Sequence, residues 1–371
     1  MNVIAVLGGG AGGLATAIDL VLRGFSVRYW ARSASRLTDG ELVATGVLDG
    51  RVRPHVITDD VAHALEGAQA AVVSLPATAY PTVVAALADA ARAGPGLPTL
   101  ILHPGHTGGA LGVAAQLRKA NASVPAIVEM STLAYVARSP APGTVSVTGL
   151  AQRVRGAACF DSGDGNALEA ARRLFPCVTP ERDVLATSLS NVNLVVHPPG
   201  ALLSAAWVEA TDGQFTFYSD AMTPGVARVI SALDRERRIV AAAFGHRLPL
   251  LELEMVAIGT ADVARAAAAD LRGAIAGVAA NATIMAPDSL AHRYYREDFA
   301  YGLVPFLALA DIAEVDVPLA RSLVITAAAL LGVERATWGL TVDKLGIAGY
   351  GVAALQGLVR GELGYDERST R

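Results

Sequence analysis

Short apolar runs alternate with longer amphipathic stretches along the first half of the chain. Apolar runs that contain β-branched residues and stop at glycine or proline predict buried strands at 2–8, 25–30, 68–76, 98–104, 126–133 and 143–150. Between them, apolar residues at helical spacing predict helices such as 14–23 and 81–93. This alternation is typical of an α/β domain whose mainly parallel sheet carries helices on both faces.

The pattern changes near Thr187. From there on we find few strand-like runs, and apolar residues recur at helical spacing in 226–245, 264–282 and 319–332, the first of which contains a charged DRERR patch. Proline, glycine and polar clusters separate these segments. We therefore predict two domains, an α/β domain at 1–185 and an all-α domain at 186–371, which suits a chain of 371 residues.

The composition argues against an intrinsically disordered protein and against a transmembrane protein. Hydrophobic residues make up 53% of the chain and charged residues 17%, and the mean hydropathy is +0.42, so the chain is not intrinsically disordered. Apolar runs such as 322–333 are too short to span a bilayer. We predict no transmembrane helix and no membrane partner.

Charge and cysteine content bear on the partners, the metal content and the compartment of the protein. The net charge is −4, and no basic run is interleaved with aromatic residues, which argues against a nucleic-acid partner. Cys159 and Cys177 lack C-x-x-C spacing, so we predict no metal site and a reducing compartment. The N-terminal apolar stretch has no basic segment before it, which is unlike a signal peptide, and we predict a cytoplasmic protein.

A glycine-rich turn follows the first predicted strand. Gly8, Gly10 and Gly13 satisfy the G-x-G-x-x-G pattern, and they lie between a strand and a helix, which is the context the pattern requires. The first glycine permits a tight turn, the second lets the backbone approach a pyrophosphate, and the third lets the helix pack closely on the strand. The turn predicts a Rossmann-type dinucleotide site. The site is also predicted to include Ala11, Gly12, Leu75 and Pro76.

The end of the second strand bears on the choice of dinucleotide. An NAD site has an acidic residue there to bind the ribose 2′-hydroxyl, whereas this chain has Ala31, Arg32 and Ser33, with Arg36 nearby. An arginine binds a 2′-phosphate through charge-assisted hydrogen bonds, and a serine hydroxyl can add another. The alternative is a solvated loop. We predict that NADP(H) is preferred, with NAD(H) as the second option.

The second half contains a histidine before two prolines. His197 follows an apolar stretch in 187–200, and Pro198 and Pro199 are expected to stop the chain from continuing as a helix there. An imidazole titrates near neutral pH and can act as a general acid or base. By itself, His197 is equally compatible with a structural role in the core or at a helix end.

The segment 292–305, HRYYREDFAYGLVP, gathers histidine, arginine, tyrosine and carboxylate side chains in a chain that is otherwise poor in charge. An aspartate that binds the far nitrogen of a histidine fixes its tautomer, and an arginine beside it can bind a carboxylate. A surface cluster of ion pairs is the alternative. The other histidines considered, His103, His106, His246 and His292, are expected to be structural or in loops.

These motifs together resemble the opine dehydrogenase family, whose best-known members are octopine and nopaline dehydrogenase. The resemblance covers almost the whole chain and includes GGGAGG (8–13), HPGHTGGAL (103–111), EMSTLAYVAR (129–138), SNVNLVVHPPG (190–200), LDRERRIVAAAFG (233–245), RYYREDFAYGLVP (293–305) and DKLGI (343–347). It implies a Rossmann domain, a helical domain and a substrate cleft between them. It also implies NAD(P)H-dependent reductive condensation of an amino acid's amine with a 2-oxo acid such as pyruvate.

Carried over by motif, the resemblance implies that His197 is the catalytic histidine, Asp298 its partner and Arg293 the arginine next to the substrate. Thr132 or a neighbour in 129–135 is expected to add a hydrogen bond to substrate. In a regular helix neither Arg293 nor Arg296 would share a face with Asp298, so the correspondence alone selects Arg293. The chain departs from the family at four positions: Ala31, where many members have aspartate, and His103, Ala134 and Ala137, where Asn, Pro and Cys are more usual.

The function we predict is that of an NADPH-preferring opine dehydrogenase in which His197 and Asp298 form an acid/base dyad. Two alternatives keep the fold: a ketopantoate-type, 2-oxo-acid or 3-hydroxyacid reductase, and an NADP-binding regulatory protein without turnover. The reductases usually place a lysine in the helical domain, and neither Lys119 nor Lys344 replaces His197 well. The substrates' identity, the stereochemistry and the oligomeric state, a homodimer included, stay open.

Overall fold

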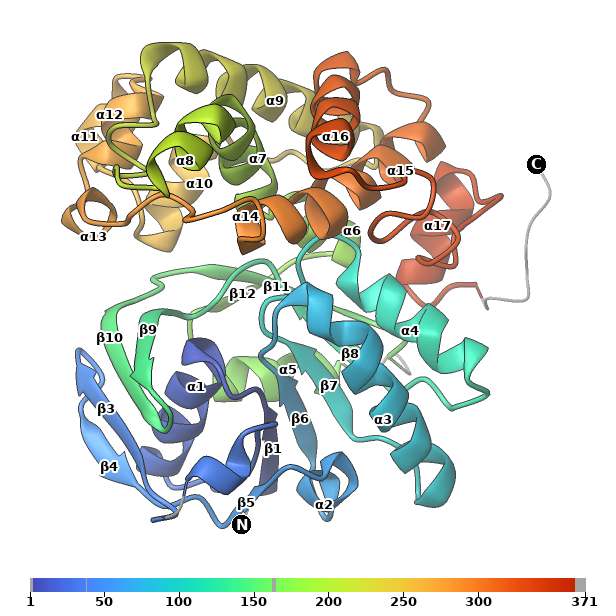
Figure 1. Ribbon diagram of the computed structural model, residues 1–371. Helices are drawn as coiled ribbons and strands as arrows, with labels where there is room; N and C mark the ends of the chain where they lie inside the picture. The colour runs from blue at the N-terminus through green and yellow to red at the C-terminus, as the bar shows by residue number, and fades with distance from the viewer. Residues whose placement is uncertain (1–2, 38, 162–164, 364–371) are drawn as a thin grey trace. The chain divides into compact units, whose positions relative to one another are not determined.

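Eight strands from the first half of the chain form one sheet in the order β12-β11-β8-β7-β6-β1-β2-β5, seen in the computed structural model of Figure 1. The strands are β1 Val3–Leu7, β2 Ser26–Trp30, β5 Val56–Thr58, β6 Ala70–Val73, β7 Thr99–Leu102, β8 Ile127–Met130, β11 Val154–Cys159 and β12 Val178–Pro180. Neighbouring strands are parallel except β8 and β11. The structure describes residues 3–37, 39–161 and 165–363.

The order β5-β2-β1-β6-β7-β8 is that of a dinucleotide-binding sheet, in which the chain winds first to one side of β1 and then to the other. β1 and β6 are adjacent although two α-helices and four strands separate them in the sequence. Such a reversal opens a crevice at the carboxyl ends of the two strands, where ligands bind in open α/β sheets. The predicted α/β class of the first half is confirmed.

Helices surround this sheet, and the predicted helices at 14–23 and 81–93 are present as the first and third of them. They are α1 Ala11–Leu22, α2 Val61–Leu65, α3 Tyr80–Ala93, α4 Gly109–Lys119, α5 Asn166–Leu174 and α6 Val184–Leu189, with short 3-10 turns at Ala34–Arg36 and Ala77–Ala79. In Figure 1, α3 and α4 lie side by side, and α4 also contacts β8.

A second sheet of four strands covers α1. Its order is β4-β3-β10-β9, with β3 Leu42–Gly46, β4 Gly50–Val52, β9 Tyr135–Ala141 and β10 Thr144–Leu150. The predicted strand at 143–150 therefore exists, but it pairs with β3 and β9 rather than extending the main sheet. Helix α1 contacts β1 and β2 on one side and β9 and β10 on the other. This explains why α1 is buried along most of its length.

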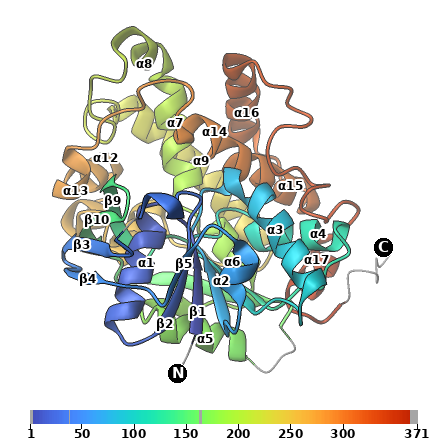
Figure 2. The ribbon, with the colours of Figure 1, turned by 60° about the horizontal axis from the view of Figure 1, so that its bottom comes forward.

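The second half is helical, as predicted. Its helices are α7 Asn193–Leu203, α8 Ala205–Thr211, α9 Pro224–Ala243, α10 Leu251–Ile258, α11 Val263–Ala267, α12 Leu271–Ala276, α13 Ala279–Ala282, α14 Arg293–Arg296, α15 Val304–Ile312, α16 Pro318–Leu331 and α17 Val352–Val359, with a π-helix, η3, at Phe299–Leu303. Figure 2 shows α14 beside α7, and α7 also packs on α9 and α16.

The segment 264–282 does not form the single helix that its composition suggested. It divides into α11, α12 and α13 because Asp262 and Asp270 accept hydrogen bonds from backbone amides and cap new helices at Val263 and Leu271. Ala269, with a φ of 56°, interrupts the chain between α11 and α12.

Backbone contacts group the chain into two compact units. The first runs to Gly105, continues through Gly109–Thr187 and takes in Val359–Glu362, whereas the second contains His106–Gly108 and Ser188–Leu358. Three residues of the first half thus belong to the helical unit. No helix in the described part of the chain is long and apolar enough to cross a membrane.

Candidate active site

The glycine turn between β1 and α1 is tightly packed on one side and open on the other. A Cβ on Gly8 would stand 2.1 Å from the carbonyl oxygen of Ser74, and one on Gly13 would stand 2.0 Å from that of Gly8. A Cβ on Gly10, by contrast, would meet no atom within 4 Å. Gly8 and Gly13 are therefore needed for packing, whereas Gly10 leaves room for a group to approach the N-terminus of α1, of which it is the N-cap. Such a cradle fits a dinucleotide pyrophosphate.

The loop after β2 lies against the same turn. The Cβ of Ala31 and the Oγ of Ser33 lie 3.0 and 3.9 Å from the position that a Cβ on Gly9 would take. Arg32 and Arg36 are exposed, and Arg36 ends the 3-10 turn Ala34–Arg36. Among the residues predicted for this site, Leu75 and Pro76 lie two and three positions after the end of β6, and Ala11 and Gly12 open α1.

A buried histidine links this turn to the loop that carries Thr132. The hydroxyl of Thr16 donates to the carbonyl of Gly12 and lies 3.3 Å from Nδ1 of His103, whose Nε2 accepts the amide N–H of Ala134 at 2.7 Å. Burial lowers the pKa of His103 to about 3, so the ring stays neutral and keeps this acceptor. His103 is thus structural, and Thr132 stands half-buried in the loop that it anchors.

The prediction that Pro198 and Pro199 end a helix is wrong. Helix α7 continues through both prolines to Leu203, although each proline removes one backbone donor from the helix. Leu194–Ala201 are all buried and α7 packs against α8, α9, α14 and α16, so the packing of this helix outweighs the two missing hydrogen bonds. His197 and Gly200 consequently share one helical face, one turn apart.

An irregular helix brings Asp298 to His197. α14 ends at Arg296, and η3 follows with a hydrogen bond from the Leu303 amide to the Asp298 carbonyl. Within η3, a Cβ on Gly302 would stand 3.1 Å from Cβ of Leu194 in α7. The absence of a side chain at Gly302 therefore allows η3 to pack closely on the helix that carries His197.

His197 and Asp298 form a buried pair. Nδ1 of His197 lies 2.9 Å from Oδ2 of Asp298, and the two side chains are 5% and 3% exposed. The ring of Tyr294 stacks on the imidazole at a centroid distance of 3.9 Å, and Nε2 lies 2.8 Å from the hydroxyl of Tyr218. An ionised aspartate on Nδ1 holds the proton there and leaves Nε2 as the basic nitrogen.

Arg293 lies beside the dyad in a cluster of charged groups. Its Nε is 3.6 Å from Oε2 of the buried Glu297, whose Oε1 is 3.4 Å from Nε2 of His106. Partial burial would lower the pKa of Arg293, but the carboxylates of Asp298 and Glu297 outweigh it and raise the pKa. About half of the Arg293 side chain is exposed, so it can meet a ligand. Arg296 is exposed as well.

Tyr218 and the turn that presents it were not among the predicted site residues. Three aromatic residues in the segment 215–218, within a chain that is 5% aromatic, were the available signal. Sequence alone does not connect this segment with His197, since no periodic pattern joins a turn to a helix 21 positions away. Glu297 and His106, which face each other, were likewise given no role.

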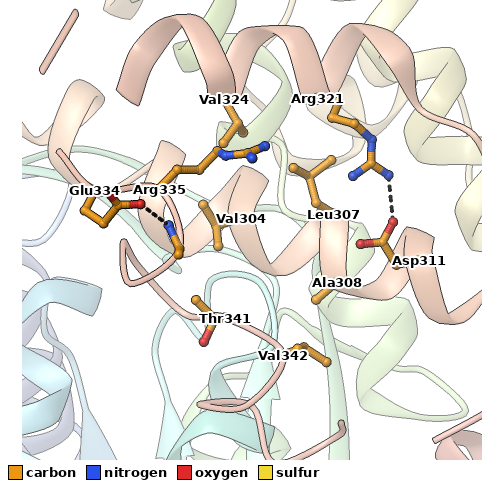
Figure 3. Close-up of a pocket in the computed structure, with 11 residues that line it drawn as sticks. Val304, Leu307, Ala308, Asp311, Arg321, Val324, Glu334, Arg335, Thr341 and Val342 are labelled. Atoms are coloured by element: carbon orange, nitrogen blue, oxygen red, sulfur yellow. Dashed lines mark hydrogen bonds and ion pairs between the residues drawn. The ribbon is translucent and has the colours of Figure 1, made fainter. Parts of the chain in front are cut away.

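A separate cavity of about 270 Å3 lies among α15, α16 and the segment 334–342 (Figure 3). Arg321 pairs with Asp311 at 2.6 Å on its rim, and Glu334 and Arg335 stand across from them. These charges balance, so the cavity offers no net charge for a carboxylate ligand. Within the part of the chain that the structure describes, no group of three or more His, Cys, Asp or Glu is placed to hold a metal ion.

Two sequence comparisons relate this chain to known proteins. The profile of a family described as NAD/NADP octopine/nopaline dehydrogenase, alpha-helical domain, matches residues 180–331. The opine dehydrogenase of Arthrobacter sp. (strain 1C) is 32% identical over 361 residues, which cover 96% of this chain and 98% of that one.

Solved structures agree with this at the level of the fold. Octopine dehydrogenase with NADH and L-arginine superposes with a TM-score of 0.74 at 21% identity, covering 98% of this chain and 99% of the other. Yersinopine dehydrogenase with NADP+ gives a TM-score of 0.71 at 18% identity, covering 98% of each chain. Because the Arthrobacter opine dehydrogenase is 32% identical over nearly the full length, the chain belongs to the opine dehydrogenase family of NAD(P)-dependent oxidoreductases, which act on the CH–NH group of donors.

Proposed function

We propose that this protein is an NADPH-preferring opine dehydrogenase that joins the amine of an amino acid to a 2-oxo acid through an imine. The observation that carries the proposal is the buried His197–Asp298 pair, with Nδ1 and Oδ2 2.9 Å apart. Two solved relatives of the same fold support the substrate and cofactor classes, since octopine dehydrogenase binds NADH with L-arginine or pyruvate and yersinopine dehydrogenase binds NADP+.

The dyad moves the protons of the condensation. Asp298 keeps the Nδ1 proton of His197 in place and stabilises the imidazolium that forms when Nε2 accepts a second proton. Imine formation requires a proton to leave the amino group and another to reach the departing oxygen, and one imidazole can serve both steps in turn. The rings of Tyr294 and Phe217, at 3.9 and 6.0 Å from the imidazole centroid, limit the access of water to it.

Substrate carboxylates need fixed partners. We assign one to Arg293, whose guanidinium can bind a carboxylate through two parallel hydrogen bonds, and a further hydrogen bond to Thr132. The pairing of Arg293 with Glu297 would limit the rotamers of this long side chain before the substrate arrives.

The domain at 1–185 is assigned to the dinucleotide and that at 186–371 to the substrate chemistry. Gly8, Gly10, Ala11, Gly12 and Gly13 would hold the pyrophosphate at the N-terminus of α1. Arg32 and Ser33, with Arg36 behind them, would bind the 2′-phosphate. Leu75 and Pro76 would contact the dinucleotide after β6. When bound, the nicotinamide supplies the hydride that reduces the imine carbon.

The function is tested by following NADPH oxidation with amino acids paired with pyruvate, glyoxylate, oxaloacetate or 2-oxoglutarate. We expect turnover only when both an amine and a 2-oxo acid are present. Turnover with a 2-oxo acid alone would identify a 2-hydroxy-acid or ketopantoate-type reductase instead. Binding of NADPH without turnover of any pair would identify a regulatory protein.

The cofactor preference depends on Arg32. Loss of a charge-assisted hydrogen bond costs about 1.5–3 kcal/mol, so Arg32→Ala should raise the KM for NADPH by about tenfold or more and leave the weaker NADH activity nearly unchanged. Initial rates with each cofactor measure this. Arg53→Ala, an exposed arginine of the same unit, is the control and should change neither KM. Equal losses with both cofactors would refute the assignment.

Two arginines of one short helix provide a matched test of carboxylate binding. Arg293→Lys keeps the charge but loses the guanidinium fork, so the KM of the 2-oxo acid or the amino acid should rise by about tenfold. Arg296→Lys, in the same helix, should change it little, because no role in the site is assigned to Arg296. NADPH binding, followed by fluorescence, should be the same in both variants. The reverse ranking would show that Arg296 is the carboxylate ligand.

A further inference from the structure

The basic nitrogen of His197 already has a partner. With Nδ1 bound to Asp298, the remaining nitrogen, Nε2, accepts the hydroxyl of Tyr218 at 2.8 Å. A proton that passes between this nitrogen and a substrate must therefore either pass through the Tyr218 hydroxyl or wait until that hydroxyl has moved away. The way in which Tyr218 is held decides between these two routes.

The turn that carries Tyr218 is held by several hydrogen bonds. Oδ2 of Asp220 accepts both the amide N–H and the hydroxyl of Thr216, each at 2.8 Å, and these bonds lower the pKa of Asp220. Thr216 also forms a bridge with Met285, and the amide of Phe217 donates to the carbonyl of Ile284. These contacts fix Thr216 and Phe217 before Tyr218 and Asp220 after it.

Helix α7 is shaped to receive this turn. A Cβ on Gly200 would stand 2.7 Å from Cζ of Phe217, so only glycine lets the Phe217 ring lie against α7 one turn beyond His197. Phe217 belongs to the buried cluster with Ala201 and Tyr295, and Tyr218 packs on the edge of that cluster. Glycine in the HPPG motif therefore helps to set the distance between Tyr218 and His197.

We propose that Tyr218 is a catalytic residue that relays protons between His197 and the substrate. This inference rests on the proposed function, because it assumes that His197 is the acid/base. Tyr218 is partly exposed while His197 is buried, so Tyr218 is the member of this pair that a ligand can reach from solvent. Burial, together with Tyr294 and Asp298, raises the pKa of Tyr218, so it acts as a neutral hydroxyl that gives one proton as it takes another.

The relay balances over imine formation. First, Tyr218 gives its hydroxyl proton to Nε2 of His197 and takes one from the substrate ammonium, which leaves a neutral amine and an imidazolium. The amine adds to the 2-oxo carbon, and its proton shifts to the oxygen to form a carbinolamine. Tyr218 then gives its proton to the carbinolamine hydroxyl and takes one from the imidazolium. The C–O bond breaks, water leaves with the electron pair, and the nitrogen lone pair forms the C=N bond of an iminium ion.

The test compares Tyr218→Phe with Tyr295→Phe. Both substitutions remove one hydroxyl, but that of Tyr295 donates to the carbonyl of Ala201 in α7 and takes no part in the relay. We expect kcat to fall by about 10² for Tyr218→Phe, with an unchanged dissociation constant for NADPH, and to stay within about twofold for Tyr295→Phe. Circular dichroism reports whether each variant folds.

A proton inventory separates relay from packing. Two protons move together in a relay, so kcat of the wild-type protein should depend on the deuterium fraction of the solvent along a curve, and kcat of Tyr218→Phe along a straight line. A kcat of Tyr218→Phe close to wild type would overturn the proposal, and so would a reduced kcat with the curved inventory retained. If Tyr218→Phe does not fold, 3-fluorotyrosine is introduced at position 218 instead. It keeps the ring and the hydrogen bond, and kcat should change if the hydroxyl relays protons. An active His197→Ala protein would instead refute the dyad itself.

Discussion

His197→Ala is expected to lower kcat by about 10² or more while NADPH still binds, because a positioned acid/base contributes at least this factor. Asp298→Asn should have an effect of similar size, since an amide neither stabilises the imidazolium nor fixes the Nδ1–H tautomer. Steady-state rates at saturating substrates measure kcat, and fluorescence titration measures NADPH binding. His55→Ala, an exposed histidine, and Asp316→Asn, an exposed aspartate, are the matched controls.

The double variant examines the pairing itself. Because His197 and Asp298 act as a unit, the double variant should be little slower than the slower single variant. Fully additive losses would show that the two side chains act independently, even though their atoms lie 2.9 Å apart.

Arg237→Met should destabilise the helical unit by about 3–5 kcal/mol, because it removes one partner of a buried ion pair. Arg237 is 1% exposed, and its Nε donates to Oδ1 of Asp234 at 2.8 Å. Its other nitrogens donate to the carbonyls of Leu189 and Pro249, which connects α9 to the segments before α7 and α10. Methionine fills much of the space but leaves these acceptors unpaired. Urea unfolding, followed by circular dichroism, measures the loss.

Two further variants complete this measurement. Arg235→Met, an exposed position of α9, should change the free energy of unfolding by about 0.5 kcal/mol or less. Adding Asp234→Leu to Arg237→Met should recover part of the loss, because the uncompensated buried carboxylate is then gone. A fully stable Arg237→Met protein would show that the buried pair does not hold α9 in place.

Much of the fold could be predicted from local pattern. The spacing of apolar residues and the glycine and proline stops predicted five of the eight strands of the central sheet, β1, β2, β6, β7 and β8, and the helical character of the second half, because both depend on side chains near one another in sequence. Strands β4, β5 and β12 span three residues each, too few for such a pattern, and β3, β9 and β11 were also not predicted. The separate sheet that covers α1 could not be predicted either, because it depends on the parallel pairing of β10 with β3, which are far apart in the sequence.

For the candidate site, sequence motifs were sufficient to select the two segments that matter but not their geometry. Reading 234–238 as a charged patch missed that Asp234 and Arg237 are buried, because burial depends on what packs against the helix. We expected Pro198 and Pro199 to stop the helix because each removes one backbone hydrogen bond. The burial of α7 against its neighbours, which outweighs this loss, is not visible in the sequence.

The sequence by itself determined an α/β half with a dinucleotide turn, a helical half, and two motifs rich in polar side chains, since each is a property of neighbouring residues. Only the tertiary structure decided that these motifs meet. His197 lies 101 positions from Asp298 and 21 from Tyr218, and the three side chains come together because Gly302 and Gly200 let η3 and Phe217 pack closely on α7. Contacts of this kind depend on the shapes of elements that are distant in sequence, and no local pattern encodes them.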